Sequence, residues 1–318
     1  MNTARLDGNT VLVPEPLGSR LHSRHLVGDP GPKGLRLSLV EAAWCLLGGR
    51  LTVEGAAKAG DLLRRGDGQT EVDYLAYADL RERGLVVRHA GASFAVWPRG
   101  SGLDAAPAYT VRAFSERTPI AASELARCIG SILALVDDDG AVTHYKLEES
   151  APEGARAVGA LPAAEGVLLR DRVLVEDPAV REAWAAEGIG VPHGAGLVVS
   201  LVEAEHLLHR KALTLPKGTK LSERQADLLL LAAVHEAVRS RGALCKSGFK
   251  FGTHFRAYRE NPDDAHAEWL VQAVPADGQM PWSDLSRAIR LAHGVRKTFL
   301  LAVAGPTVRF FAFSWFRP

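Results

Sequence analysis

The stretch SLVEA occurs at residues 38–42 of this chain and occurs again at residues 200–204. Working outward from it, VLV at residues 11–13 returns in the same register at residues 173–175. When residues 11–52 are set against residues 173–214, 16 of the 42 positions are identical without a gap. Shared composition alone would not hold one register for so long, so the chain is predicted to be a tandem duplication.

The later part of each half repeats more weakly. Six residues recur 160 positions further on, namely Val111, Ala113, Ser123, Leu125, Arg127 and Ile129. The offset drifts elsewhere, which exposed loops tolerate. Each half is therefore predicted to hold a small N-terminal subdomain and a larger nuclease-like subdomain. The expected boundaries are 1–69, 70–150, 151–220 and 221–318.

Local patterns predict an α/β (α+β) fold with a mixed sheet in each larger subdomain. Apolar spacing and Ser200 as N-cap predict a helix over residues 200–213, and a second helix is expected over residues 223–242, ending at Gly242. Segments 269–274, 298–304 and 307–316 are rich in β-branched and aromatic residues and are predicted to be strands. The last of these has few charges to protect an edge, so we expect it to pair with another strand.

Composition excludes several classes of protein. The 318 residues are 47% hydrophobic and 24% charged, as a folded globular chain requires. No apolar run is long enough to cross a bilayer and the N-terminus has no signal-peptide pattern, so a cytoplasmic protein without membrane contact is expected. Three scattered cysteines favour neither disulfides nor a zinc site, and no cofactor or metal is expected.

The second half keeps chemical groups that the first half lacks. GFKFGTHFRAY at residues 248–258 shrinks to AGASFAVW at residues 90–97, so that Tyr258 corresponds to Trp97. His266 corresponds to Ala106, and RLAHGVRK, which ends at Lys297, has no counterpart in the aligned sequence. Each of the three has an ordinary alternative: a packed strand-end tyrosine, a loop histidine, a solvated helix-end lysine. Their joint loss from one copy favours a chemical role, because core positions should survive in both.

These motifs carry a family resemblance. GFKFGTHFRAY, HAEWLVQAV at residues 266–274 and RAIRLAHGVRKTFLLAV at residues 287–303 resemble the catalytic domain of archaeal tRNA-intron (splicing) endonucleases. The duplicated layout is similar to the homodimeric tandem-repeat type of that family. The resemblance implies that a homodimer cuts precursor tRNA at bulge–helix–bulge sites, and that Tyr258, His266 and Lys297 form its catalytic triad.

The implied roles suit metal-free RNA cleavage. Tyr258 would act as general base on the ribose 2′-hydroxyl and His266 as general acid on the departing 5′-oxygen. Lys297 would stabilise charge on the phosphorane, and the products would be a 2′,3′-cyclic phosphate and a 5′-hydroxyl. Nearby cations must lower the pKa of a tyrosine base, and Lys246, Lys250, Arg256 and Lys297 are the candidates.

Further contacts follow from the same resemblance. Arg290 matches the first of two arginines that clamp a flipped base, and Arg309 is the candidate for the second. Lys250 and Arg256 are expected to bind RNA. The acidic turn at Asp137, Asp138 and Asp139 is expected to dock into a basic pocket of a second copy, although an ordinary hairpin turn has the same composition. The charge balance of −3 over residues 71–148 and +4 over residues 223–318 fits docking.

Three rival interpretations remain open from the sequence. A metal-dependent nuclease would use Asp263, Asp264 and Glu268, the acidic residues near the motif. The chain could also be a non-catalytic RNA-binding scaffold, or a purely structural partner subunit. His206 and His209 have the spacing of a helical metal site, but no third ligand lies nearby and a solvated helix face is favoured.

Overall fold

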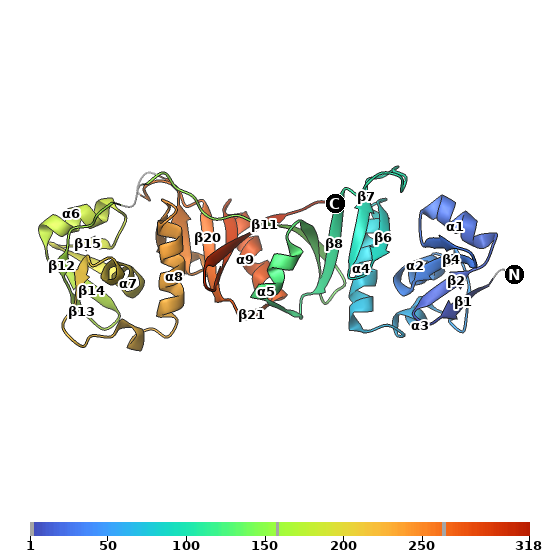
Figure 1. Cartoon of the computed structure of the whole chain (residues 1–318), viewed down its shortest axis with the longest axis horizontal. Helices are drawn as coiled ribbons and strands as arrows, with labels where there is room; N and C mark the ends of the chain where they lie inside the picture. The colour runs from blue at the N-terminus through green and yellow to red at the C-terminus, as the bar shows by residue number, and fades with distance from the viewer. Residues whose placement is uncertain (1–2, 157–158, 263–264) are drawn as a thin grey trace.

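The computed structural model describes residues 3–156, 159–262 and 265–318, arranged as an elongated row of four units (Figure 1). The first unit, at the N-terminal end, has a five-stranded sheet of order β3-β4-β2-β1-β5. Its strands are β1 (Ala4–Asp7), β2 (Thr10–Val13), β3 (Asp29–Gly31), β4 (Gly34–Ser38) and β5 (Val53–Glu54). Its helices are α1 (Leu17–His25), α2 (Leu39–Leu47) and α3 (Ala59–Leu63).

The equivalent unit of the second half lies at the opposite end of the row. Its strands are β12 (Ala164–Glu165), β13 (Val167–Leu168), β14 (Arg172–Val175), β15 (Val191–His193), β16 (Gly196–Ser200) and β17 (Leu213–Thr214). Its helices are α6 (Pro178–Ala186) and α7 (Leu201–His209). The parallel pair Ala164↔Leu213 repeats the pair Ala4↔Val53. In both copies, the first strand of the small unit therefore pairs with the strand that follows the capped helix. Ser38 and Ser200 each cap the following helix in a capping box, which explains why SLVEA survives twice.

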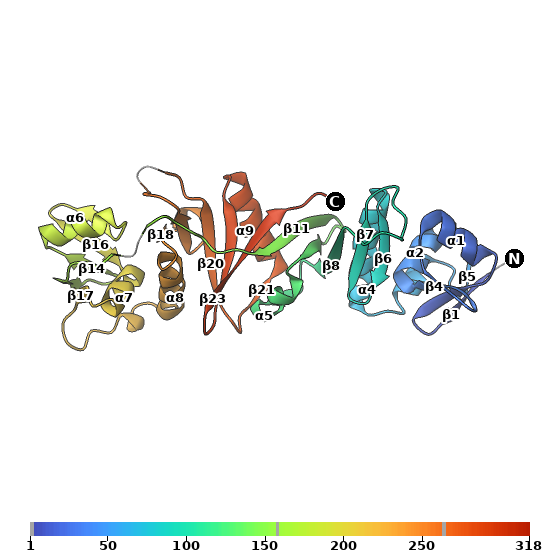
Figure 2. The ribbon, with the colours of Figure 1, turned by 45° about the horizontal axis from the view of Figure 1, so that its top comes forward.

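The two larger units share one ten-stranded sheet in the middle of the row, of order β18-β19-β20-β22-β23-β11-β10-β8-β7-β6 (Figure 2). The first-half strands are β6 (Val86–Ala90), β7 (Ser93–Trp97), β8 (Tyr109–Ser115), β10 (Ser131–Val136) and β11 (Val142–Glu149). The second-half strands are β18 (Leu244–Ser247), β19 (Phe255–Tyr258), β20 (Trp269–Pro275), β22 (Thr298–Ala304) and β23 (Val308–Trp315). Antiparallel pairing of β11 with β23 joins the halves, and β9 (Pro119–Ala121) pairs with β21 (Gln279–Pro281) below them.

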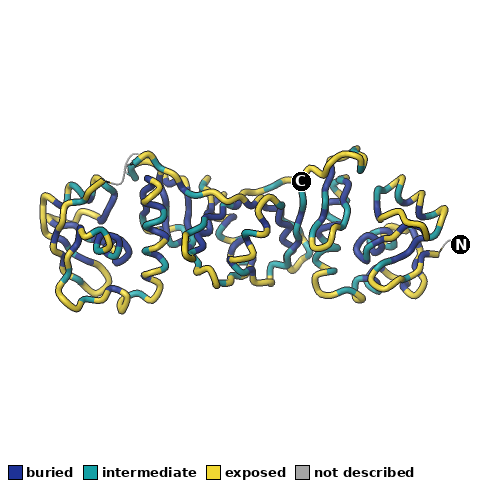
Figure 3. Tube along the Cα trace, in the orientation of Figure 1, coloured by how far each residue is buried: buried dark blue, intermediate teal, exposed yellow. Residues whose placement is uncertain are grey.

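Helices cover both faces of this sheet, and the buried residues lie between the layers (Figure 3). On one face, α4 (Gly68–Glu82) and α8 (Leu228–Arg239) each pack on the strands of their own repeat. On the other face, α5 (Ala122–Leu125) and α9 (Trp282–Gly294) contribute to one common core. The two repeats therefore form one folded body across the β11–β23 seam.

The structure tests the expected elements. It confirms the three strands as β20, β22 and β23, and β23 is paired on both edges as expected. The helix expected over residues 223–242 is wrong at its start: α8 begins at Leu228 and ends at Arg239. Residues 222–227 are exposed or half-buried and offer no apolar face to the core. Among the described residues, no helix has both the length and the apolar character needed to cross a bilayer.

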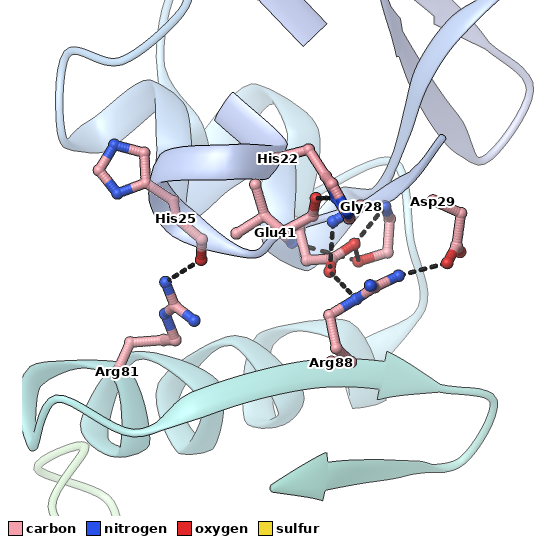
Figure 4. A network of polar contacts seen from close by, with 9 residues as sticks. His22, His25, Gly28, Asp29, Glu41, Arg81 and Arg88 are labelled. Atoms are coloured by element: carbon pink, nitrogen blue, oxygen red, sulfur yellow. Dashed lines mark hydrogen bonds and ion pairs between the residues drawn. The ribbon is translucent and has the colours of Figure 1, made fainter. Parts of the chain in front are cut away.

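A buried glutamate links the small unit to the larger one in each repeat. Figure 4 shows the first: Glu41 accepts hydrogen bonds from the backbone of Gly28 at 3.1 Å and Ser38 at 3.0 Å. It also lies 3.5 Å from Nε of Arg88, on β6 of the larger unit. Glu203 repeats this arrangement with Gly190, Ser200 and Lys246, whose Nζ is 3.2 Å away. The conserved glutamate therefore fixes the angle between the two units of each half.

Candidate active site

The three candidate catalytic residues lie at one end of the second-half sheet. Tyr258 is the last residue of β19, His266 precedes β20 by three residues, and Lys297 immediately precedes β22. Because β19 runs antiparallel to β20 and β20 runs parallel to β22, the end of β19 meets the starts of β20 and β22. The topology therefore brings together residues separated by as many as 39 positions.

Ala267 connects the three. Its carbonyl oxygen accepts a hydrogen bond from Nζ of Lys297 at 2.6 Å. Its side chain is buried in one small cluster with Leu244 and Tyr258. His266, the residue before it, is exposed to solvent. The tyrosine is thus buried, the lysine half-buried and the histidine exposed.

Of the four cations expected near the tyrosine, Arg256 contacts its ring, whereas Lys246 pairs with Glu203. The guanidinium carbon of Arg256 lies 5.8 Å from the centre of the Tyr258 ring, and its Nε donates to the carbonyl of Ser247 at 2.8 Å. Burial, and then the charge of Arg256, lowers the pKa of Lys297. Lys297 therefore loses its charge at a lower pH than a free lysine does. Lys250 is exposed on the turn before β19.

In the first repeat, strand register identifies what stands at each equivalent position. Trp97 ends β7 as Tyr258 ends β19, and its indole N–H donates to the carbonyl of Ala105 at 2.7 Å. Ser131 pairs with Thr110 as Phe299 pairs with Leu270, which puts Ile129 at the position of Lys297 and not at that of Ile289, as the constant offset of 160 predicted. Trp97, Ala106 and Ile129 carry no group that could exchange a proton at the 2′-hydroxyl or hold a phosphate. The sequence alignment had found no counterpart for the lysine.

The two arginines expected to clamp a base lie at different ends of the sheet. Arg290 is exposed on α9, and its Nη2 is 3.3 Å from Oγ1 of Thr143 on β11. Arg309 pairs with Val303 near the far end of β22 from Lys297, and forms an ion pair with Glu149 at 2.7 Å. The structure does not bring Arg309 to the other candidates.

Trp315 is a candidate that the sequence reasoning missed. It ends β23 at the same end of the sheet as Lys297, and 43% of it is exposed. Its ring lies 6.0 Å from that of His293 on α9. Strand alternation puts Trp315 on the same face as the buried Phe311 and Phe313, so the pattern predicted a core residue. The face is exposed there because α9 ends at Gly294.

The acidic turn between β10 and β11 is exposed and internally ordered. Asp137 accepts backbone hydrogen bonds from Asp139 at 3.1 Å and Ala141 at 2.8 Å. Asp138 pairs with Nε of Arg117 at 2.6 Å, and this arginine lowers the pKa of its carboxyl group. Asp139 is exposed at the tip.

A cavity of about 590 Å³ separates α7 from the catalytic sheet at the junction of the second half. Its lining includes Arg172, Lys246 and Arg256, the histidines His193, His235 and His254, and one acidic residue, Glu203. The equivalent cleft of the first half is lined by Arg65 and His89 but also by Asp67 and Asp73. Only the cleft of the second half is thus markedly basic.

Glu268 and His206, two of the residues weighed for a metal site, have other partners. Glu268 pairs with Arg259 at 3.0 Å, and Asp263 and Asp264 lie outside the described residues. The solvated helix face expected at His206 is wrong: this side chain is buried against α8, where it contacts Glu236 and meets the His235 ring edge to face at 5.0 Å. Within the described ranges, no group of three or more His, Cys, Asp or Glu side chains could hold a metal. Burial lowers the pKa of both His206 and His235.

The fold and the site define a class: a tandem-repeat α/β protein whose second repeat has Tyr258, His266 and Lys297 where the first has Trp97, Ala106 and Ile129. The model of the tRNA intron endonuclease catalytic C-terminal domain matches residues 70–144 and 229–308, once in each half. The model of the tRNA intron endonuclease N-terminal domain matches residues 164–226. The double match confirms the duplication.

Curated relatives give the same answer. Proteins named tRNA-splicing endonuclease from Methanosarcina mazei and Natronomonas pharaonis are 33% and 35% identical to this chain. The alignments cover 94% of both chains for the first and 92% of both for the second. A relative of the same name from Haloarcula marismortui is 34% identical over 94% of this chain and 93% of its own. The chain belongs to the tRNA-splicing endonuclease family.

Proposed function

We propose that this protein excises introns from precursor tRNA by cutting bulge–helix–bulge sites without a metal ion, leaving 2′,3′-cyclic phosphate and 5′-hydroxyl ends. The contact between Lys297 and the carbonyl of Ala267 carries the proposal, since it joins the lysine to the residue that follows His266 and packs on Tyr258. Family membership supports it independently.

Each residue has a distinct task in the proposed reaction. Tyr258 removes the proton of the 2′-hydroxyl as that oxygen attacks the neighbouring phosphorus, and Arg256 lies beside its ring. His266 gives a proton to the departing 5′-oxygen. The ammonium of Lys297 offsets the charge gathering on the non-bridging oxygens. Unpaired bulge nucleotides suit this chemistry because they can adopt the in-line geometry that a duplex prevents.

For base clamping we propose Arg290 together with Trp315, in place of Arg309. An arginine and an indole can hold a flipped base between a cationic plane and an aromatic plane. Arg290 and Trp315 are both exposed, and His293 on α9 links the tryptophan to the arginine's helix. The ion pair with Glu149 leaves Arg309 a structural role across the β11–β23 seam.

The function is tested with an end-labelled bulge–helix–bulge RNA in excess EDTA, beside a fully paired RNA of equal length. We expect two cuts in the first RNA, none in the second, cyclic phosphate ends, and a rate that EDTA does not change. A requirement for divalent metal would contradict the proposed mechanism. Tight binding of the bulged RNA without cleavage would assign the protein to the non-catalytic RNA-binding class.

We also propose a homodimer in which the acidic turn of one copy enters the basic cavity of the other. The turn belongs to the first repeat and the cavity to the second, so a two-fold axis would form the contact twice. The contrast between the two clefts supports this choice, because the acidic groups of the first cleft would repel the turn.

The double variant Asp138→Asn/Asp139→Asn is expected to weaken dimerisation at least about tenfold. The neutral amides lose the attraction that carboxylates have for cations at a desolvated interface. Light scattering over a concentration series measures this. Asp277→Asn removes an exposed charge from a turn of the catalytic repeat and serves as the matched control. Equal dimerisation of all three proteins would argue that the turn is an ordinary hairpin.

A further inference from the structure

The loop that leads into β19 exists in the catalytic repeat alone. Residues 248–254 connect β18 to β19, whereas residues 91–92 suffice between β6 and β7. The longer loop is well ordered: the Gly248 N–H bonds the carbonyl of His254 at 2.9 Å, and the Phe251 N–H bonds that of Gly248 at 2.8 Å. A side chain at Gly248 would come within 2.6 Å of the Thr253 carbonyl oxygen, so glycine is required there.

Two phenylalanines on this loop have opposite environments. Phe251 packs against the core beneath α9, and its ring centre lies 5.8 Å from Nζ of Lys297. Phe249, two residues earlier, is 87% exposed, more than any other large hydrophobic side chain in the described part of the chain. An ordered loop thus exposes the phenyl ring of Phe249 to solvent, two residues before the ring that contacts Lys297.

The surroundings of Phe249 favour one kind of occupant. Lys250 follows it in sequence, Arg256 is bound to the carbonyl of Ser247 at the base of the loop, and Lys297 contacts Phe251. An aromatic ring among cations is the composition of sites for single-stranded nucleic acid, where bases stack on the ring and phosphates meet the charges. A hydrophobic protein partner would have no use for these cations.

We propose that Phe249 stacks on an unpaired base next to the cleaved phosphodiester and thereby contributes to the recognition of bulged RNA. This inference rests on the proposed function. It adds a contact on the β18–β19 loop that is separate from Arg290 and Trp315, which lie on α9 and β23. It also accounts for the loss of the loop from the repeat that has no catalytic groups.

The test measures binding of an RNA with a 2′-deoxy nucleotide at each cleavage site, which removes the nucleophile. We expect Phe249→Ala to weaken binding about 5- to 150-fold, the range for loss of one stacked base. Phe249→Trp should stay close to wild type, and Phe249→Leu should behave like alanine because it keeps apolar area without a π face. Leu229→Ala, at an exposed position on α8, is the control and should bind as wild type does.

An RNA that carries abasic sites at the bulge positions separates stacking from a structural effect. On this RNA, wild type and Phe249→Ala should bind equally. The inference is overturned if Phe249→Ala binds the intact RNA normally, if its defect persists on the abasic RNA, or if light scattering shows that the variant loses a dimer contact instead. Failure of the proposed function is distinguishable, because wild-type protein would then cut no bulged RNA.

Discussion

His266→Ala is expected to lower the single-turnover rate of RNA cleavage by about 10²–10⁴-fold, the usual contribution of a general acid. Binding of the uncleaved RNA should change little, because the exposed imidazole acts on the 5′-oxygen only as it departs. Lys297→Ala should reduce the rate comparably, and Tyr258→Phe should too. His209→Ala, at an exposed histidine of α7, is the matched control and should cleave as wild type does.

A modified substrate distinguishes the acid from the other two groups. A 5′-bridging sulfur at the cleavage site leaves as a thiolate and needs no protonation, so it should restore most of the rate to His266→Ala. It should not restore Tyr258→Phe or Lys297→Ala, whose proposed tasks are performed at other atoms. Rescue of all three variants to the same degree, or full activity of His266→Ala on ordinary RNA, would remove His266 from the acid role.

The sequence was most informative where both copies preserve the same physical requirement. SLVEA survives because the serine caps a helix and the glutamate bonds a glycine turn, and both needs arise in each half. Strands β20, β22 and β23 were predictable because their composition suits a sheet buried on both faces. The loss of Tyr258, His266 and Lys297 from the first copy could likewise be detected from the alignment.

Features that depend on where one element ends beside another could not be predicted. Trp315 follows the alternation of buried residues and is exposed only because α9 stops short of it. His206 looked solvated, yet it contacts α8, which is distant in sequence. The equivalent pair in the first repeat is Trp44 and Tyr77, also in edge-to-face contact, so the duplication held a signal that residue type concealed. Arg309 became a seam residue because β23 pairs with β11.

Glu203→Ala is expected to lower the free energy of unfolding of the second half by about 3–5 kcal/mol, the cost of removing one partner of a buried ion pair. Four donors lose their acceptor at once: the Gly190 N–H at 3.1 Å, the Ser200 N–H at 3.0 Å, the Ser200 hydroxyl at 2.8 Å, and Nζ of Lys246 at 3.2 Å. Lys246 keeps only the Gly190 carbonyl at 2.8 Å, which does not neutralise its charge.

Glu41→Ala is a matched control that the duplication supplies. The Glu41 carboxylate accepts from the N–H groups of Ser38 and Gly28 as Glu203 does in its own half, so loss of these capping-box bonds should cost both variants about 1 kcal/mol. Arg88, however, retains an ion pair with Asp29 when Glu41 is removed (Figure 4). The cost of Glu41→Ala should therefore be clearly smaller than that of Glu203→Ala.

Hydrogen exchange read by peptide measures the two costs separately, because each reports opening of its own half. Glu203→Ala should speed exchange across β16 and β18, and Glu41→Ala should affect β4 and β6 less. Glu203 is the acidic residue of the basic cavity, so the first variant should not weaken docking of the acidic turn, and the second, at a residue outside that cavity, should leave dimerisation unchanged. Equal losses of protection in both halves would mean that capping, and not the buried charge pair, holds the units together. The capping-box bonds of Glu203 would then stabilise the second repeat to the same extent as those of Glu41 stabilise the first.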